Sequence, residues 1–341
     1  MRRAGTSWLL AISTMVAGTV ASGAVTAPAA RAAGPVAADD GAAVAEETWI
    51  DPRTVDLTIR TPAVGGQEKT RVMLPAGWSR TAGRTWPVVY AYQGGNDDYL
   101  SWVRGSQLAS LAAKWDVIVA LPSGGTHGGY TDWYNYGKGG TPRWETFHTE
   151  EVLQLLERNY RAGTRRAALG VSSGGQGAIT YAARHRGMFA YAVSFSGVLR
   201  LTKPGLPSML MLQGLGFGDD PFRTWGIPGV HDANWKAHDP YELAERLRGT
   251  GLYISSGTTG LPGPYDPDPV NPNGNVAGAV GEFLVGITAT DFVARLKKLG
   301  IPATTNLYVG GWHNWRYWRP ELDKAWPLMM DALGVEAPAG S

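Results

Sequence analysis

The 341-residue chain contains no cysteine and only six histidines, and its charges almost cancel. Without cysteine the chain forms no disulfide, so an exported form would depend on its packed core for stability. Thirty-one lysines and arginines face 29 aspartates and glutamates, a formal net charge of +2. This balance provides no basic surface for nucleic acid, which we therefore do not expect as a partner.

The first 32 residues have the features of a secretory signal peptide. Arg2 and Arg3 precede an apolar stretch over 8–20, and small residues lead to an Ala-x-Ala site at 30–32. The apolar stretch is too short and too interrupted for a membrane span, so no stable membrane insertion is expected after cleavage. Residues 33–48 have no hydrophobic period and predict a disordered leader. We expect a secreted protein, either released or retained at the cell envelope.

From residue 49 to residue 336 the pattern predicts one α/β domain. Alternation over 55–59 and 70–74 indicates an opening antiparallel pair, and continuous apolar runs over 87–92 and 117–121 indicate buried parallel strands. Further strands and helices then alternate, as in a mostly parallel sheet flanked by helices. The expected later strands cover 189–195, 251–255 and 304–309, and the expected helices cover 145–160, 240–248, 278–299 and 320–333.

A glycine-serine turn stands between a short apolar run and a helical pattern. It reads Gly170-Val171-Ser172-Ser173-Gly174, the G-x-S-x-G pattern of a nucleophile elbow. Glycines relieve crowding in such a tight turn because they have no Cβ atom. The helix N-terminus that follows favours negative charge at the serine. Ser172 is therefore the predicted nucleophile, although the same pattern also fits a helix-capping serine.

A serine hydroxyl needs an imidazole to accept its proton, and few histidines are present. His313 lies in a glycine-aromatic loop between the last strand and the last helix, where this fold carries its base. We interpret His127, His185 and His231 as surface or capping residues. His148 and His238 are interpreted as structural, although His238 is also placed to line the cleft.

The third member of such a triad is a carboxylate between Ser172 and His313 in the chain. Asp266 and Asp268 lie in a proline- and glycine-rich loop, and Glu282 lies near the start of the next helix. Spacing alone leaves all three open. The Asp266-Pro267-Asp268 pair has no further ligands at calcium-binding spacing, so we expect no metal site there.

Two backbone N–H groups are expected to stabilise an oxyanion. One belongs to Ser173, and the other comes from the glycine-rich loop Gln93-Gly94-Gly95-Asn96 after the 87–92 strand. The apolar segment 206–215 is either a lid or acyl-chain wall or a buried structural segment, and the sequence favours neither.

Several blocks in combination resemble the secreted mycolyltransferases of the antigen 85 group and the wider esterase D-like α/β-hydrolases. The resemblance covers roughly residues 55–333. The blocks that carry it are Asp97-Asp98-Tyr99, Trp102, Tyr130-Thr131-Asp132-Trp133-Tyr134, Trp144-Glu145-Thr146-Phe147, Gly170-Val171-Ser172-Ser173-Gly174, Phe189-Ala190-Tyr191-Ala192, Ser196-Gly197, Trp235-Lys236-Ala237-His238-Asp239-Pro240 and His313-Asn314-Trp315-Arg316-Tyr317-Trp318.

The resemblance implies a helix-borne glutamate as the acid, with Ser172 and His313. If Phe292 is matched to the family's helix pattern, counting back from it places the glutamate on Glu282. If Phe283-Leu284 is matched instead, Val285 occupies that position and the triad has no acid. The resemblance also implies an oxyanion N–H near Gly95 and places Trp315 against the substrate.

The chain departs from the family at the loop that contacts sugar. Where the family has Asp-Gly-Leu-Arg, this chain has the shorter Gln93-Gly94-Gly95, which makes Gln93 and Gly94 the corresponding substrate contacts. A position after Ser196-Gly197 that is often acidic or amide in the family is Arg200. Trehalose and mycolic acid are therefore not specifically predicted as substrates.

The predicted function is a secreted serine esterase or acyltransferase that forms an acyl-enzyme on Ser172. An acyl ester is the substrate, and water, a sugar hydroxyl or a lipid hydroxyl is the acceptor. This chemistry requires neither a cofactor nor a metal. The alternative is a non-catalytic extracellular binding protein, because the family that the chain resembles includes members without a complete triad.

Overall fold

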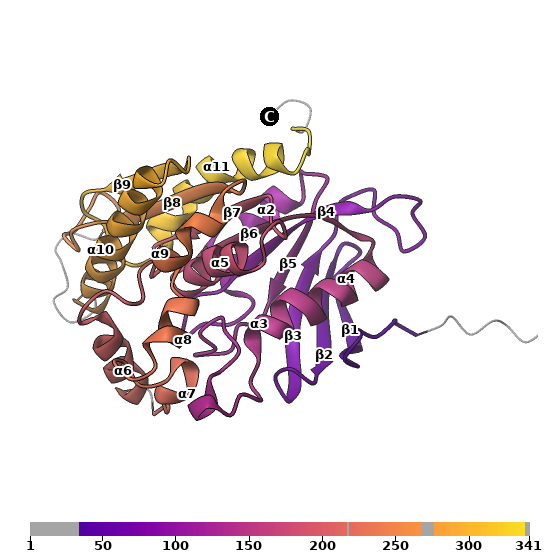
Figure 1. The fold of residues 1–341 in the computed structure, drawn as a ribbon. Helices are drawn as coiled ribbons and strands as arrows, with labels where there is room; N and C mark the ends of the chain where they lie inside the picture. The colour runs from indigo at the N-terminus through magenta and orange to yellow at the C-terminus, as the bar shows by residue number, and fades with distance from the viewer. Residues whose placement is uncertain (1–33, 217, 267–275, 338–341) are drawn as a thin grey trace, which may run out of the picture. The chain divides into compact units, whose positions relative to one another are not determined.

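The computed structural model describes residues 34–216, 218–266 and 276–337 (Figure 1). The predicted signal peptide and Asp268 lie outside the described residues. Every element named below lies in the unit that begins at Pro35.

In the described residues, nine strands form one sheet in the order β1-β2-β3-β5-β4-β6-β7-β8-β9. The three N-terminal strands are antiparallel, β3 also pairs antiparallel with β5, and all later neighbours are parallel. This confirms the predicted opening pair and the mostly parallel sheet. The strands are β1 (Ala43–Asp51), β2 (Thr54–Thr61), β3 (Gly66–Met73), β4 (Trp86–Tyr92), β5 (Ile118–Pro122), β6 (Ala162–Val171), β7 (Tyr191–Phe195), β8 (Gly251–Gly257) and β9 (Thr304–Tyr308).

Helices cover both faces of this sheet (Figure 1). Alternate residues of β4 explain why: Val88 and Tyr90 belong to a core cluster that also contains residues of α4, α5 and α10, whereas Val89 and Ala91 belong to a second cluster with residues of α1, α2 and α11. A strand buried on both sides must be apolar throughout, which is why 87–92 is a continuous apolar run. The helices are α1 (Ser101–Gly105), α2 (Leu108–Ala112), η1 (Asn135–Gly137), α3 (Trp144–Thr146), η2 (Phe147–Glu151), α4 (Val152–Tyr160), α5 (Ser173–Arg184), α6 (Leu206–Gly216), α7 (Phe222–Trp225), α8 (Asp232–Ala237), α9 (Pro240–Leu243), η3 (Ala244–Leu247), α10 (Val276–Lys298) and α11 (Trp315–Ala332).

The predicted disordered leader over 33–48 is wrong for its described part. β1 starts at Ala43 and pairs with β2, and the N–H groups of Val36 and Asp39 donate to Asn159 and Gln154 of the 152–160 helix. Most side chains of this edge strand are exposed, so no apolar pattern marks it. Main-chain hydrogen bonds to β2 hold it instead, and side-chain hydrophobicity cannot report these bonds.

Among the described helices, α10 alone is long and apolar enough by composition to cross a membrane. In the structure it packs on β8 and contributes Phe292 and Leu296 to the main core. The packing of α10 on the sheet therefore explains part of its apolar composition.

Between β7 and β8 the chain makes a helical excursion. Helices α6, α7 and α8 gather at the lower left of Figure 1. They have a small core of their own, formed by Leu201, Met211, Trp225 and Trp235. This excursion lies beyond the carboxyl end of β7, so it can form a wall beside the end of the neighbouring β6.

Candidate active site

The turn between β6 and α5 holds Ser172 in a backbone conformation that residues other than glycine seldom adopt, with φ 54° and ψ −125°. Its N–H donates to the Phe195 carbonyl at 2.9 Å. A Cβ atom on Gly170 would lie 2.0 Å from the Gly174 oxygen, and one on Gly174 would lie 2.3 Å from the Gln93 oxygen. The glycines at both positions are therefore required for this strand–turn–helix, as the sequence predicted.

Glu282 and His313 are in direct contact. Glu282 Oε2 lies 2.8 Å from His313 Nδ1, and the carboxylate is fully buried. An ionised carboxylate only accepts hydrogen bonds, so Nδ1 carries a proton and donates it to Glu282. In the neutral imidazole this leaves Nε2 without a proton, the tautomer that a general base requires.

Other donors hold the remaining oxygen of Glu282. Oε1 accepts from the Gly257 N–H at 2.6 Å, the Ser196 hydroxyl at 2.8 Å and the Ser256 hydroxyl at 3.2 Å. These bonds come from the ends of β7 and β8. They satisfy a buried carboxylate that would otherwise be expensive to desolvate.

The loop aspartate that the sequence left open has other partners. Asp266 accepts from Tyr317 Oη at 2.7 Å and from the Gly263 N–H at 2.9 Å. Burial and the hydrogen bond to Asp266 raise the pKa of Tyr317 to about 12. Val285, the residue in the alternative helix register, lines the cavity. Of the carboxylates weighed from the sequence and described here, Glu282 is the one that contacts His313.

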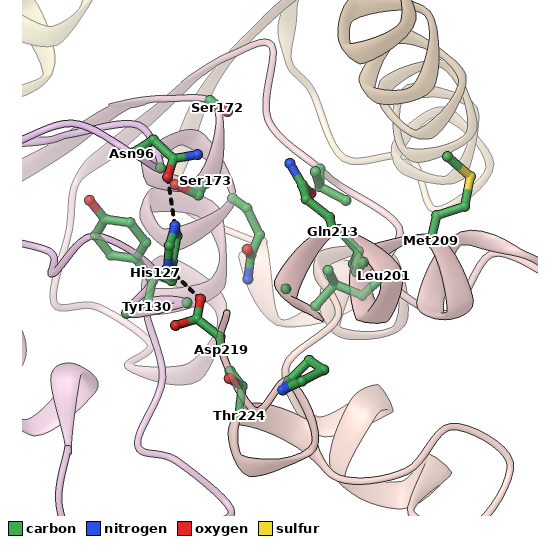
Figure 2. Close-up of a pocket in the computed structure, with 18 of the residues that line it drawn as sticks. Asn96, His127, Tyr130, Ser172, Ser173, Leu201, Met209, Gln213, Asp219 and Thr224 are labelled. Atoms are coloured by element: carbon green, nitrogen blue, oxygen red, sulfur yellow. Dashed lines mark hydrogen bonds and ion pairs between the residues drawn. The ribbon is translucent and has the colours of Figure 1, made fainter. Parts of the chain in front are cut away.

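Ser172, Ser173, Gly95 and His313 all line one cavity of about 540 Å³. This volume is within the range of small-molecule sites. Figure 2 shows Ser172 and Ser173 at the upper edge, Asn96, His127 and Asp219 on one side, and Leu201 and Met209 on the other.

The glycine loop after β4 runs beside the serine turn. A Cβ atom on Gly94 would lie 3.5 Å from Ser172 Cβ, and one on Gly95 would lie 3.6 Å from Ser173 Oγ. The backbone after β4 therefore lies close to the elbow, as an oxyanion site requires.

The three residues predicted to contact substrate are not among those that line the cavity. The Gln93 side chain is buried; its Nε2 donates to the Asp97 carbonyl at 2.5 Å, and its Oε1 accepts from the Gly124 N–H at 3.2 Å. It therefore braces two loops. Gly94 contributes its close approach to Ser172 rather than a lining surface.

Trp315 packs away from the cavity lining, which corrects the contact implied by the family resemblance. Its ring lies 5.1 Å from the rings of both Trp102 and Trp318. It also packs on Gly105, where a Cβ atom would lie 2.2 Å from the indole. The first turn of α11 is thereby fixed against α1, next to the loop that carries His313.

The α6 segment, for which the sequence left two interpretations, forms one wall of the cavity. Leu206, Met209 and Leu210 line it from α6, and Val280 and Leu284 line it from α10. An apolar wall on this side suits a hydrocarbon chain.

His127 was predicted to be a surface or capping residue, and this prediction is wrong. It lines the cavity, where Nδ1 pairs with Asp219 and Nε2 lies 2.6 Å from Asn96 Oδ1. It therefore joins the glycine loop after β4 to the segment after α6. In the sequence, the glycine-rich run around His127 is the signal that could have placed it in a functional loop. In the structure, Gly125 and Gly129 of this run have positive φ.

The histidines interpreted as structural lie away from the lining. His148 is buried between Tyr181 Oη at 2.9 Å and the Ser123 carbonyl at 2.8 Å, and burial lowers its pKa to about 4. Burial also lowers the pKa of His238, whose Nδ1 is 2.8 Å from the Asn234 carbonyl. His185 pairs with Glu145.

A mostly parallel sheet with a strained serine after a central strand, followed along the chain by a carboxylate and a histidine that touch, defines an α/β-hydrolase. The Esterase family model, described as "Putative esterase", matches residues 61–329. The chain belongs to this esterase family.

Two curated relatives come from mycobacteria. The chain is 30% identical to Esterase Rv1288 of Mycobacterium tuberculosis over 295 residues, which are 83% of this chain and 59% of that protein. The chain therefore spans less than two thirds of the length of this relative. It is 28% identical to the Diacylglycerol acyltransferase/mycolyltransferase Ag85B of Mycobacterium intracellulare, over 83% of this chain and 84% of that protein.

Solved structures agree with the fold. The crystal structure of Mycobacterium tuberculosis MPT51 (FbpC1) matches with a TM-score of 0.65 and 25% identity, over 82% of this chain and 97% of that one. FphF, a fluorophosphonate-binding serine hydrolase of Staphylococcus aureus, matches with a TM-score of 0.60 and 19% identity, over 81% and 97%. The predicted α/β-hydrolase fold and the resemblance to mycolyltransferases and esterases are confirmed.

Proposed function

We propose that the protein is a serine esterase or acyltransferase that works through an acyl-enzyme on Ser172. The observation that carries this proposal is the contact between buried Glu282 and His313 at the cavity that Ser172 also lines. The strained turn presents Ser172 there, and a strained catalytic serine is typical of this fold.

The proposed reaction begins with attack of Ser172 on the ester, with His313 as the base. His313 Nε2 accepts the Ser172 proton as Oγ bonds to the ester carbonyl carbon. The N–H groups of Gly95 and Ser173 donate to the oxyanion. When the tetrahedral intermediate collapses, the ester C–O bond breaks and His313 returns the proton to the leaving alcohol. Glu282 holds the imidazole in the required tautomer and stabilises its positive charge.

The acyl group is released from Ser172 by a second nucleophile. Water gives an esterase, and a sugar or lipid hydroxyl gives an acyltransferase. The two relatives described above carry both kinds of name, Esterase and Diacylglycerol acyltransferase/mycolyltransferase. We assign the acyl chain to the apolar wall formed by α6 and α10, because burying hydrocarbon there removes it from water.

We also propose that the chain is exported, with residues 1–32 as the signal peptide. The sequence pattern of this segment and the absence of cysteine are compatible with export. N-terminal sequencing of the protein recovered from culture medium tests this, with Ala33 expected as the first residue. Recovery only from the cytosol with Met1 retained would contradict it.

The test of the activity uses p-nitrophenyl esters of short and long acyl chains, with wild type beside Ser172→Ala. We expect turnover in the wild type and its loss in the variant, together with fluorophosphonate labelling of Ser172. Products of a reaction run with trehalose or glycerol distinguish transfer from hydrolysis. Absence of both turnover and labelling would leave a non-catalytic binding protein on the same fold.

A further inference from the structure

Two residues that line the cavity each carry a buried N–H donor without a hydrogen-bond partner among the described residues. The donors are Gln176 Nε2 and Trp225 Nε1, on side chains of residues only 3% and 8% exposed. Every other buried side-chain nitrogen or oxygen of the described residues that lacks a hydrogen-bond partner belongs to a residue outside the cavity lining. Native proteins pair most of their buried polar atoms, so two unpaired donors at one cavity indicate a ligand.

Gln176 lies one helical turn beyond the reactive serine. Its backbone N–H donates to the Ser172 carbonyl at 3.1 Å, which fixes the start of α5. Along a helix this spacing corresponds to roughly 5.4 Å. A substrate whose carbonyl carbon is bonded to Ser172 would therefore have its nearby atoms within reach of the Gln176 amide.

Trp225 belongs to the apolar side of the cavity. Its ring lies 5.1 Å from the Trp235 ring, and it packs in the small core with Leu201 and Met211. The nearby polar groups already have other partners, since the Trp225 carbonyl accepts from Asn234 Nδ2 and the Gly226 carbonyl accepts from Trp235 Nε1. Trp225 and residues of the apolar helix α6 contribute to the same lining.

The chemistry of the lining selects the kind of acceptor. An indole N–H can only donate, and a carboxamide NH₂ group donates as well. No lysine or arginine is present among the described residues of the lining, whereas Asp219 and Asp220 are. An anionic oxygen would meet like charge, and the described lining provides no permanent cation, only the titratable His127 and His313, so a neutral oxygen is favoured.

We propose that Gln176 and Trp225 form a subsite for a neutral acceptor oxygen, an ether or oxo oxygen, carried by the acyl group of the ester. The acyl group is selected over the alcohol because Trp225 lies in the apolar cluster that includes Met211 of α6, the side assigned to the acyl chain. This inference rests on the proposed esterase function. It adds that plain alkanoyl esters are the poorer substrates, because they leave both donors unpaired.

The first experiment compares acyl groups of one length. The p-nitrophenyl esters of hexanoate, 4-methoxybutanoate, 3-ethoxypropanoate and 4-oxohexanoate are compared by kcat/KM, each divided by its rate of alkaline hydrolysis. We expect wild type to favour at least one oxygenated ester by about tenfold, the size of effect expected from one buried donor left unpaired. Equal values for all four esters would overturn the inference.

The variants localise the preference. Gln176→Met and Trp225→Phe keep much of the side-chain volume and remove the donor, so the ratio of kcat/KM for the oxygenated ester to that for hexanoate should fall toward one. Gln213→Met is the matched control, because Gln213 is an exposed amide of the same lining. A preference that is unchanged in both donor variants would overturn the inference.

A binding measurement does not depend on turnover. In the Ser172→Ala protein labelled with ¹⁵N-tryptophan, the Trp225 indole resonance is identified by its loss in Trp225→Phe. The p-nitroanilide of 4-methoxybutanoate should move this proton downfield, and the p-nitroanilide of hexanoate should not. Equal responses, or none, would overturn the subsite. Absence of ester turnover in wild type with a selective shift would instead refute the proposed catalysis alone.

Discussion

Glu282 Oε2 lies 2.8 Å from His313 Nδ1, although the two residues are 31 positions apart in the chain. Glu282 comes from the first half of α10, and His313 comes from the loop after β9. A second contact supports the pair, because the His313 N–H donates to the Gly278 carbonyl at 3.1 Å in the same part of α10. Helix and loop are thereby fixed to each other, and the imidazole is held in one orientation.

Glu282→Gln should lower kcat/KM on p-nitrophenyl esters by about 10³-fold or more, by analogy with acid-to-amide changes in serine triads. The amide oxygen can keep the bonds from Gly257 and Ser196, which turns the NH₂ group toward His313. The imidazole then accepts at Nδ1 and carries its proton on Nε2, so it cannot act as the base. Steady-state kinetics test this, with circular dichroism to confirm folding.

Asp266→Asn is the matched control for the acid. Asp266 bonds Tyr317 and Gly263 rather than His313, so kcat/KM should stay within a few-fold of wild type. The reverse result, in which Asp266→Asn abolishes activity and Glu282→Gln preserves it, would contradict the proposed acid.

Gly170→Ala should lower the free energy of unfolding by ~2 kcal/mol or more and reduce activity. The added methyl group would lie 2.0 Å from the Gly174 oxygen, and backbone cannot move aside as a flexible side chain can. Urea denaturation measures the change. Gly66→Ala is the control, since a Cβ atom there meets nothing within 4 Å and it should alter stability by less than ~1 kcal/mol.

Glu151→Gln should raise stability at pH 8 relative to wild type and leave it similar near pH 4.5. Burial, together with nearby Asp40, raises the pKa of Glu151 to about 7. The folded chain therefore holds this proton more tightly than the unfolded chain, and wild type loses stability as pH rises from about 4.5 through 7. The amide does not titrate and can still accept from the Ala63 N–H. Urea denaturation of both proteins at several pH values across this range measures their free energies of unfolding. Coincident pH profiles for the wild type and the variant would contradict the raised pKa of Glu151.

The titration of His148 should change the free energy of unfolding in the opposite direction, lowering it as pH falls. Burial lowers its pKa to about 4, so the unfolded chain binds the proton more tightly. Its contribution disfavours folding as pH falls from about 6.5 to 4, by as much as ~3 kcal/mol. His148→Gln removes the titration and should flatten this part of the pH profile, even if it lowers stability at pH 8. An unchanged slope between pH 6.5 and 4 would refute this role for His148.

Met209→Trp should reduce kcat/KM for p-nitrophenyl octanoate by about tenfold and leave the acetate within about twofold. Met209 lines the cavity from α6, so a larger side chain occupies space assigned to the acyl chain (Figure 2). Leu212→Trp is the matched control on the same helix, because Leu212 is 68% exposed and is not among the lining residues. An equal loss on both esters would place the acyl chain elsewhere.

Local patterns predicted the parts of the fold that local physics controls. The apolar run over 87–92 predicted a strand buried on both faces, and β4 is such a strand. The glycines around Ser172 predicted the elbow, because the turn excludes a Cβ atom at Gly170 and Gly174. These features depend on dihedral angles and burial within one segment, which the chain encodes in adjacent residues.

Other positions could not be predicted because several side chains of the right type compete for them. Glu282 and Asp266 were both suitable carboxylates, and Gln93 had the polarity of a substrate contact. Packing of α10 on β8 brought Glu282 to His313, while Gln93 turned inward to brace two loops. Such outcomes depend on which elements pack together, information that is spread over the whole chain.

Local patterns therefore specify the mostly parallel sheet, the strained turn at Ser172 and the position of His313 after the last strand. The tertiary structure alone decided that Glu282 is the carboxylate on His313, that His127 lines the cavity, and that Trp315 packs on Gly105. The physical reason is that a side chain's partners are set by the packing of distant segments, and a one-dimensional pattern does not specify that packing.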